Sequence, residues 1–405
     1  MLAVSGAPDG TAPVAGRRVV VTGLGVVASC GIGPAPFWAG LLGPAPVGRV
    51  RPVDGLEVSH LYGPKEVRRV DRFTQLAAVA ADQAVNDAGG ADALRGDPDR
   101  AGAHIGTGVG GLDTLCEQHR VLLERGPDRV SPFLVPMIMC NRAAADISMR
   151  YGLRGPCEAT VTACAAGTQS IANAGRLIAT GRCDVMVAGG SEAPLSELGI
   201  AGFSNMTALS RSGVSMPFDA RRDGFVIGEG AGVVVLEERV RAMARGAHIY
   251  AELAGAASTA DAHHITAPLP DGTGASRCME LALADAQMAA GEITHINSHG
   301  TSTPPGDAAE AEAIYKVFGA AGPPVTSVKG VLGHTLAAAG AIEAVAVALT
   351  IEHHQIPPTA GTRDVDPAFQ LDIVTDAPRD WSPGPVLSNS FGFGGHNGCL
   401  LMVPA

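Results

Sequence analysis

The sequence predicts an α/β fold built from a duplicated α/β unit, and three observations lead to this prediction. Short apolar runs typical of buried strands alternate along the chain with segments whose apolar residues recur at helical spacing. No Pro/Ser-rich linker divides the chain. The second part also repeats the order of the first, because each begins with a strand and a helix and closes with a pair of glycine-punctuated strands.

Composition sets limits on the core and on the partners. Of the 405 residues, 46% are hydrophobic but only 4% are aromatic, so the core must be built from Ala, Val, Leu and Ile. The formal net charge of −11 argues against a nucleic-acid-binding protein, which needs a basic face. The first residues lack the charged and apolar regions of a secretory signal, so we expect a cytoplasmic protein.

The first half of the duplicated unit is predicted over residues 18–250, after a disordered tail at residues 1–17. The tail is rich in Gly, Ala and Pro. The elements that the apolar patterns predict within this half are strands at 18–24, 104–107, 184–188 and 232–236 and a helix at 73–88.

The second half is predicted over residues 251–405. It begins with a strand at 250–255 and continues with a helix at 274–286. A strongly apolar helix follows at 336–351, interrupted by Glu343. Because this helix is too short and too polar to span a bilayer, we predict that it is buried inside the protein and that no membrane is involved.

Cys164 is the first candidate catalytic residue. It stands in VTACAAG, which predicts a strand, then the cysteine, then a helix of very small residues running to Gly181. A thiol at a helix N-terminus faces the positive end of the helix dipole, which favours the reactive thiolate. The alternative is a packed core cysteine, since the eight cysteines contain no CxxC pair.

His299 lies in a second segment that is typical of a catalytic loop. The sequence NSHGTSTPPGD ends a strand and continues as a loop dense in Gly, Pro and hydroxyl side chains. Asp307 is predicted to cap the next helix, with Glu310 three residues later in the manner of a capping box.

His334 and Lys329 stand together at the start of the apolar helix, in VKGVLGHT. Burying both side chains is costly unless they have polar partners, so the pair indicates a polar site. The glycine-laced segment FGFGGHN, with Phe391 and Phe393, predicts a bulged turn that needs positive φ at some of its glycines. Such a turn can also present backbone N–H groups to an oxyanion.

Two further patterns carry less weight. Gly106, Gly108 and Gly111 satisfy GxGxxG after a strand, but the downstream helix and acidic residue of a dinucleotide site are missing, so we interpret the motif as a turn. The pairs His263-His264 and His353-His354 invite a metal site, but neighbouring side chains point apart, so no metal is expected.

Together these motifs resemble the β-ketoacyl-acyl carrier protein synthases of the thiolase superfamily, of the elongating type II kind. The resemblance extends from Arg18 to Met402 and rests on motifs that are specific to the family. They are TACAAG, NSHGTSTPPGD, KGVLGHTLAAAG, NSFGFGGHNG, SMPFDARRDGFVIGEGAG and SPFLVPMIMCN. It implies a thiolase-like duplicated α/β unit with five layers in the order α-β-α-β-α.

The resemblance also implies roles for individual residues. Cys164 would carry the acyl chain, and His299 and His334 would stabilise the enolate that forms when malonyl-carrier protein loses CO₂. Lys329 and Glu310 would act structurally and electrostatically. The remaining implied roles are an oxyanion hole and gate at Phe393 with Phe391 beside it, pantetheine binding by Thr301 and Thr303, and a limit on acyl-pocket depth at Leu115.

Partners follow from the same resemblance. The substrates would arrive on acyl carrier protein with no separate cofactor, and a local basic surface would dock that acidic partner. The residues implied are Lys65, Arg68, Arg69, Arg72 and Arg211. The assembly would be a homodimer or a heterodimer with a chain-length-factor paralogue.

Three departures from the common family pattern indicate a specialised enzyme. His396 stands where many members have Thr, Ser298 replaces a commoner Ala, and Gly330 replaces a hydroxyl residue. A type II polyketide or polyene ketosynthase is therefore an alternative to a fatty-acid enzyme. A thiolase is a weaker alternative, for which Cys399 would supply the second cysteine.

Overall fold

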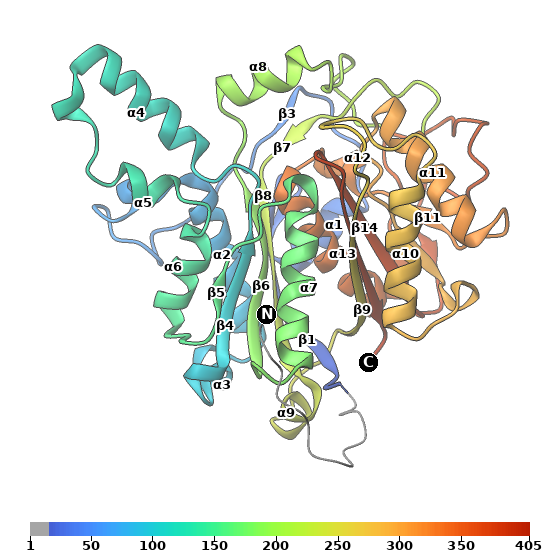
Figure 1. Cartoon of the computed structure of the whole chain (residues 1–405), viewed down its shortest axis with the longest axis horizontal. Coiled ribbons are helices and arrows are strands. Elements are labelled where there is room, and N and C mark those ends of the chain that lie inside the picture. Colours follow the sequence, from blue (N-terminus) through green and yellow to red (C-terminus); the bar gives the residue numbers. More distant parts are fainter. Residues whose placement is uncertain (1–15) are drawn as a thin grey trace, which may run out of the picture.

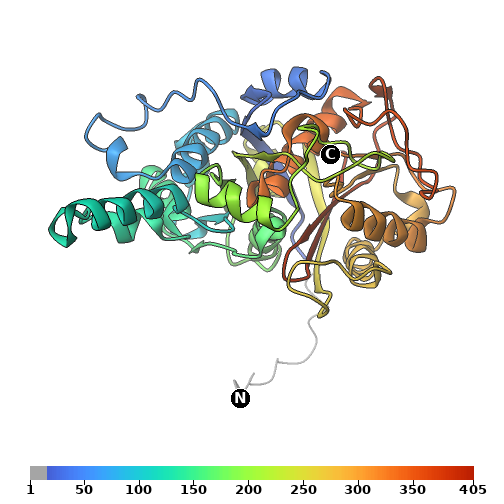
Figure 2. The ribbon, with the colours of Figure 1, turned by 90° about the horizontal axis from the view of Figure 1, so that it is seen from above.

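The computed structural model describes residues 16–405 and has five layers (Figure 1). Two helices lie between two half-sheets, and further helices cover the outer face of each half-sheet. Seen from above, the first part of the chain (blue to green) and the second part (yellow to red) lie mostly side by side (Figure 2). The predicted duplicated α/β fold and its α-β-α-β-α order are therefore confirmed. Of the predicted tail at 1–17, only Gly16 and Arg17 fall within the described residues.

The two half-sheets have the same strand order and the same directions. The first runs β5-β4-β6-β8-β1 and the second β11-β10-β14-β15-β9. In each, the outer three strands are parallel and the inner pairings are antiparallel. The strands are β1 Val19–Ala28, β4 Ala101–Gly106, β5 Cys157–Glu158, β6 Val185–Glu192, β8 Gly230–Glu238, β9 Ala251–Ala260, β10 His295–Asn297, β11 Val325–Thr326, β14 Val386–Gly392 and β15 His396–Val403.

Antiparallel pairing of β1 with β9, over Val19–Val21 and Ala251–Leu253, joins the half-sheets into one hydrogen-bonded sheet. The short strands complete the set: β2 Gly31–Ile32 pairs with β1, β3 Val50–Arg51 with β7 Ile227–Gly228, and β12 Gln355–Ile356 with β13 Arg379–Asp380.

The helices fall into three layers. The central layer holds α7 and α13, the first outer layer α2 and α6, and the second outer layer α10 and α11 (Figure 1). Their bounds are α2 Arg72–Asp87, α6 Arg142–Tyr151, α7 Ala166–Ala179, α10 Thr273–Asp285, α11 Pro304–Phe318 and α13 Ala339–His353. The other helices are α1 Pro34–Leu41, α3 Ala91–Arg95, α4 Leu112–Arg125, α5 Leu134–Ile138, α8 Glu197–Asn205, α9 Arg239–Ala244 and α12 Lys329–Leu332.

The apolar segment Leu336–His353, which contains α13, has the length and composition of a membrane span, but 89% of it is buried between the two half-sheets. The prediction of a buried helix is confirmed. Its burial explains why the segment needs no amphipathic pattern, since every face meets protein.

Glycines and alanines let the helices approach the sheet very closely. A Cβ atom on Gly25 of β1 would lie 1.8 Å from the carbonyl oxygen of Ala80 in α2. A Cβ on Gly232 of β8 would lie 2.4 Å from the backbone of Ala341 in α13. Close backbone approach of this kind is how a chain with few aromatic residues fills its core.

Candidate active site

Loops from both halves of the chain enclose one cavity of about 990 Å³. The first half contributes Cys164, just before α7, together with Glu192, Arg211 and Asp223. The second half contributes His299, His334 and Glu310, with the two threonines of the loop after β10. The predicted residues that line this cavity are Cys164, Thr301, Thr303, His299, Glu310, His334, Phe391, Phe393 and Arg211. The structure thus brings together most of the residues that the sequence singled out.

Cys164 lies in a single 3₁₀ turn, Ala163–Ala165, directly before α7. The predicted strand before it is wrong, since residues 159–162 have no regular structure and Ala163 has a φ of 48°. The thiol is only 7% exposed, and His334 Nε2 lies 3.1 Å from its Sγ.

Burial raises the pKa of the Cys164 thiol to about 11. The backbone N–H groups of Phe393 and of Cys164 itself hydrogen-bond to the sulfur and lower its pKa, as does the positive charge of Lys329, but desolvation is the larger effect. The predicted contribution that favours the thiolate is therefore present, but burial outweighs it. The dipole of α7 is not enough to charge a sulfur from which water is excluded.

His299 and His334 are buried, and their rings stand edge to face with centroids 5.3 Å apart. Each also meets an aromatic edge, His334 at Phe225 and His299 at Phe391. Desolvation, and secondarily the charge of Lys329, hold the pKa of both imidazoles well below the usual value. Both rings are therefore neutral and can donate an N–H without carrying charge.

Glu310 on α11 fixes the loop that carries His299. Its two carboxylate oxygens accept the backbone N–H groups of His299 and Gly300, at 2.7 and 2.6 Å. Asn389 lies beside them and donates its amide to Glu310 at 3.4 Å. Burial raises the pKa of Glu310 to about 7, although the two N–H donors oppose that shift.

Lys329 is buried at the start of α12 and forms an ion pair with Glu343 of α13. Glu343 is the residue that interrupts the apolar helix in the sequence. Lys329 therefore contacts Glu343, while its charge also lowers the pKa of Glu310 against the rise that burial causes. The structural and electrostatic role of Lys329 with Glu310 stays a prediction. The isolated acid inside an apolar run was the signal that could have identified Glu343 as the partner.

The turn between β14 and β15 has the predicted positive φ values, 84° at Gly394 and 73° at Gly395. This turn places the Phe393 N–H against the Cys164 sulfur and the Phe393 ring 6.4 Å from the ring of Phe203. Two backbone N–H groups, those of Phe393 and Cys164, therefore point at the sulfur.

Thr301 and Thr303 line the cavity, and their hydroxyl oxygens lie 2.9 Å apart. Thr303 is also the N-cap of α11 and accepts the N–H of Gly306. The predicted capping by Asp307 is therefore wrong. Asp307 lies inside the first turn of α11, where its buried carboxylate accepts two backbone N–H groups of neighbouring loops.

The predicted acyl-pocket residue, Leu115, lies outside this cavity. Leu115 on α4 is 46% exposed and does not line the cavity, which is lined instead by Gly108 and Val109 of the glycine-rich turn. The acyl-pocket assignment of Leu115 needs this correction, because a helix starts at Leu112 and carries Leu115 outward. The GxGxxG motif was recognised as a turn, but its place at the cavity was missed.

The basic residues divide into two groups. Lys65, Arg68 and Arg69 are exposed, and the Arg69 guanidinium stacks 4.2 Å from the Phe133 ring. Arg72 instead pairs with Glu229 at 2.6 Å as α2 begins, and its side chain is 33% exposed.

Cys399, which a thiolase would use, is fully buried in β15, outside the residues that line the cavity, and donates to Asn389. His396 begins β15 beside the Gly394 backbone. Within residues 16–405 we find no group of three His, Cys, Asp or Glu side chains that could hold a metal ion.

A five-layer α/β fold with an enclosed cysteine facing two histidines defines a class, the carbon–carbon bond-forming acyltransferases of the thiolase fold. The chain belongs to the β-ketoacyl synthase family. The description "Beta-ketoacyl synthase, N-terminal domain" matches residues 59–242, and "Beta-ketoacyl synthase, C-terminal domain" matches residues 250–363.

Similar proteins include a synthase named for acyl carrier protein and two ketosynthases of known structure. The 3-oxoacyl-[acyl-carrier-protein] synthase 2 of Staphylococcus aureus (strain COL) is 44% identical, over 95% of this chain and 98% of the relative. The ishigamide ketosynthase/chain length factor structure is 35% identical with a TM-score of 0.91, over 96% of this chain and 100% of that one. A type II polyketide ketosynthase, solved with its acyl-carrier protein and a hexaketide, is 34% identical with a TM-score of 0.85 and the same coverage.

Proposed function

We propose that this chain extends an acyl chain by two carbons through a decarboxylative Claisen condensation between an acyl thioester on Cys164 and malonyl-acyl carrier protein. The observation that carries the proposal is the meeting of Cys164, His299 and His334 in one enclosed cavity, with 3.1 Å between His334 Nε2 and the sulfur.

The first half-reaction loads the chain onto Cys164. The thiol is protonated at rest, so its proton must leave as the sulfur attacks the incoming thioester, and His334 Nε2 lies within hydrogen-bond distance to take it. The carrier thiol departs with the proton that His334 took, which returns His334 to its neutral form. The N–H groups of Cys164 and Phe393 stabilise the tetrahedral oxyanion, an effect that typically contributes about 10²–10³ in rate for each donor.

The second half-reaction uses the two neutral imidazoles. The malonyl thioester carbonyl would lie between His299 and His334, so that each donates an N–H as CO₂ leaves and the enolate forms. The enolate carbon attacks the acyl thioester, a carbon–carbon bond forms, and the carbon–sulfur bond to Cys164 breaks. The sulfur leaves as a thiolate and takes up a proton from solvent to regain its resting form. The Phe391 and Phe393 rings line this part of the cavity and would gate access between the two half-reactions.

The substrates are proposed to arrive on the phosphopantetheine of acyl carrier protein, with no separate cofactor. Thr301 and Thr303 would hydrogen-bond the arm, while Arg211 at the cavity and the exposed Lys65, Arg68 and Arg69 would attract the acidic carrier. A cytoplasmic location is proposed with them.

A second candidate is the ketosynthase subunit of a type II polyketide system, paired with a chain-length-factor paralogue. The observation that favours it is the similarity to solved ketosynthases, one of which is described with its chain length factor. The purified chain alone would then give little condensation and would gain activity when the paralogue is added.

Variants of the three central residues test the proposal. Cys164→Ala should abolish both acylation and condensation. His299→Ala or His334→Ala should leave some acylation of residue 164 but lose condensation, because each removes a donor to the enolate. Intact mass measures acylation by carrier proteins with chains of graded length, and product mass after adding malonyl-carrier protein measures condensation. Undiminished elongation by the Cys164 variant would refute the assignment.

A further inference from the structure

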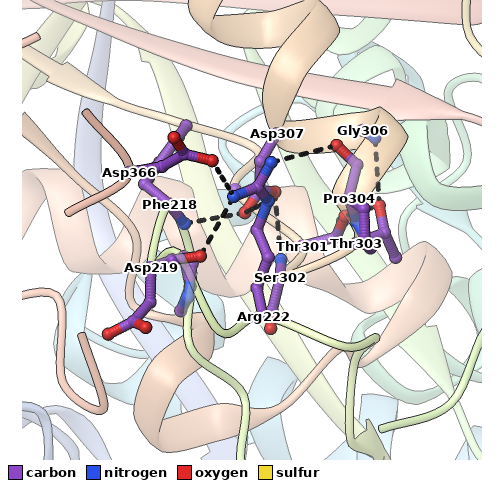
Figure 3. A network of polar contacts seen from close by, with 12 residues as sticks. Phe218, Asp219, Arg222, Thr301, Ser302, Thr303, Pro304, Gly306, Asp307 and Asp366 are labelled. Carbon is purple, nitrogen blue, oxygen red and sulfur yellow. Dashed lines mark hydrogen bonds and ion pairs between the residues drawn. The ribbon is translucent and has the colours of Figure 1, made fainter. Parts of the chain in front are cut away.

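The Arg222 guanidinium is buried beside the two threonines of the cavity and connects several loops around them (Figure 3). Its side chain is 8% exposed and reaches three segments of the chain. Nη1 donates to the Asp219 carbonyl at 3.0 Å and to the Asp366 carboxylate at 2.7 Å, while Nη2 donates to the Pro304 carbonyl at 3.4 Å. Nε lies 3.8 Å from the Asp307 carboxylate.

Asp307 connects the Arg222 guanidinium to the loop before α11. Its carboxylate is 1% exposed and accepts the N–H of Phe218 at 2.7 Å and the N–H of Ser302 at 3.0 Å. Burial raises the pKa of Asp307 to about 6, and the nearby charge of Arg222 opposes that rise. Arg222 therefore helps to keep charged a carboxylate that holds two loops together.

Ser302 is the residue that this carboxylate holds in a strained shape. Its φ is 68°, a left-handed conformation that costs a non-glycine residue roughly 1–2 kcal/mol. Besides the bond to Asp307, its hydroxyl accepts the N–H of Met216 and its carbonyl accepts the N–H of Gly224. Three bonds thus fix one turn.

The turn at Ser302 sets the positions of the Thr301 and Thr303 hydroxyl groups at the cavity. It brings their hydroxyl oxygens within 2.9 Å, so one hydroxyl donates to the other. Thr303 also accepts the N–H of Gly306. Of the two hydroxyl protons, one is used between the threonines, which leaves a single donor for a ligand carbonyl in either arrangement.

We infer that Arg222 is a positioning residue for recognition of the pantetheine arm, acting through Asp307 and Ser302 on the Thr301–Thr303 donor. Arg222 is not among the residues that line the cavity, so it does not touch the substrate. The inference rests on the proposed function, because it assigns the threonine pair to the thioester arm.

The neighbouring Arg221 offers a matched control. It is 55% exposed and pairs with the Asp219 carboxylate at 2.7 Å, but it makes no contact with Asp307 or Pro304 in the described structure. Replacing either arginine removes the same charge from the same loop. Only the loss of Arg222 removes the contacts with Asp307, Asp366 and the Pro304 carbonyl.

The experiment compares two acyl donors on Arg222→Met, which keeps the aliphatic stem. One donor is an acyl-pantetheine thioester and the other carries the same acyl group on ethanethiol, with no amide for the threonine donor. Acylation of Cys164 by the pantetheine thioester should lose about tenfold in kcat/KM, through KM, which corresponds to roughly 1.4 kcal/mol. The ethanethiol ester should react at the wild-type rate, and Arg221→Met should change neither donor.

An equal loss with both donors would show that Arg222 only supports the fold, and would overturn the inference. A double-mutant cycle with Thr301→Val and Thr303→Val adds a second criterion, since the Arg222→Met effect should vanish when the threonine hydroxyls are absent. Additive effects would also overturn it.

Two outcomes separate this inference from the proposed function. If wild-type protein shows no preference for the pantetheine ester, the assignment of the threonines fails. If it shows that preference and Arg222→Met keeps it, only the role of Arg222 fails. If Arg222→Met does not fold, Asp366→Asn is the second variant, because it removes the carboxylate that pairs with the same guanidinium. Asp366→Asn should give a smaller loss of kcat/KM, confined to the pantetheine ester. If Asp366→Asn shows no such loss, the inference is overturned.

Discussion

Burial sets the charges of the residues around Cys164. Desolvation raises the pKa of that thiol to about 11 and the pKa of Glu310 to about 7, and it lowers the pKa of both histidines. The free site therefore holds a neutral thiol and two neutral imidazoles near one cation, Lys329. Charge develops there only when a substrate arrives, and the N–H groups that meet it are already in place.

Alkylation of Cys164 should show this resting state. The rate with iodoacetamide should rise about tenfold per pH unit from pH 7 to pH 10, because the thiolate fraction grows at that rate below the pKa. Peptide mass mapping follows each cysteine separately. Cys183 is fully buried in the core and must stay unmodified if the protein remains folded. A rate that levels off below pH 8 would contradict the assigned charge state.

Loss of Lys329 should be costly in a pH-dependent way. Lys329→Met leaves the Glu343 carboxyl buried without its cation, which typically costs about 3–5 kcal/mol of stability. Burial already raises the pKa of Glu343 above its unfolded value of 4.5, and Lys329 opposes that rise. The folded variant thus binds the proton more tightly, so its unfolding free energy should fall as pH rises above 4.5.

Urea unfolding at pH 5 and pH 8 measures this effect. The variant should lose more stability at pH 8, and Lys329→Met combined with Glu343→Leu should recover most of the loss by removing both charges. The same loss at both pH values would mean that the Glu343 carboxyl is not the cause.

The sequence was sufficient to select most residues of the site but not their protonation states. Cys164, His299 and His334 each stand in a motif whose local chemistry is recognisable. The pKa of a thiol depends on how many atoms from distant segments exclude water from it, and no local pattern contains that information. The Glu343 partner of Lys329 was missed for the same reason, since 14 residues separate them.

Helix–strand contacts made through glycine govern the packing of whole elements. In Gly25→Ala the new methyl group would meet the Ala80 carbonyl of α2 and force the helix away from β1. Overpacking of this kind costs about 1–3 kcal/mol. The control is Gly202→Ala in α8, where a Cβ meets nothing within 4 Å and a helical alanine should stabilise by about 0.5–1 kcal/mol.

Thermal unfolding of both variants gives the comparison. Similar small shifts for Gly25→Ala and Gly202→Ala would show that β1 and α2 are not as close as described. Circular dichroism checks that each variant keeps its secondary structure before the midpoints are compared.

The boundaries of buried strands and helices could be predicted from the sequence, but the irregular turn before Cys164 could not. The strands β6 and β8 and the helix α2 fall within a few residues of the predicted positions, because apolar periodicity decides them. The segment before Cys164 is as apolar as a strand but is occupied by the irregular turn that the active site requires. Tertiary context overrides propensity there.

At the scale of the whole molecule, the two half-sheets have the same strand order, as expected for a duplicated α/β unit. We propose that residues 18–250 and 251–405 are its two copies. Each copy contributes one half-sheet, one central helix and part of the cavity. The nucleophile comes from the first copy and both histidines from the second, so neither copy alone would hold the proposed machinery.

The whole chain should form a dimer through the side that carries β5. Large apolar side chains are exposed around it on α4, α5 and α6, which lie together in Figure 1. Met149→Lys with Val161→Lys should weaken dimerisation, measured by analytical ultracentrifugation, because burying each apolar side chain contributes about 1.5–3 kcal/mol. Met243→Lys on α9 replaces another exposed methionine, 55% exposed against 65% for Met149, and should have no effect. An unchanged dimer in the double variant would place the interface on another face.

The central position of α13 has a consequence for synthesis of the chain. Residues 339–353 of α13 cover α7 and the inner side of the first half-sheet. They follow the end of α7 by about 160 residues. At ~5–20 residues per second, the ribosome needs roughly 8–32 s to make that stretch. During that interval a newly made first half exposes an apolar layer with no partner of its own. We therefore expect the incomplete chain to be more prone to aggregation than the finished protein.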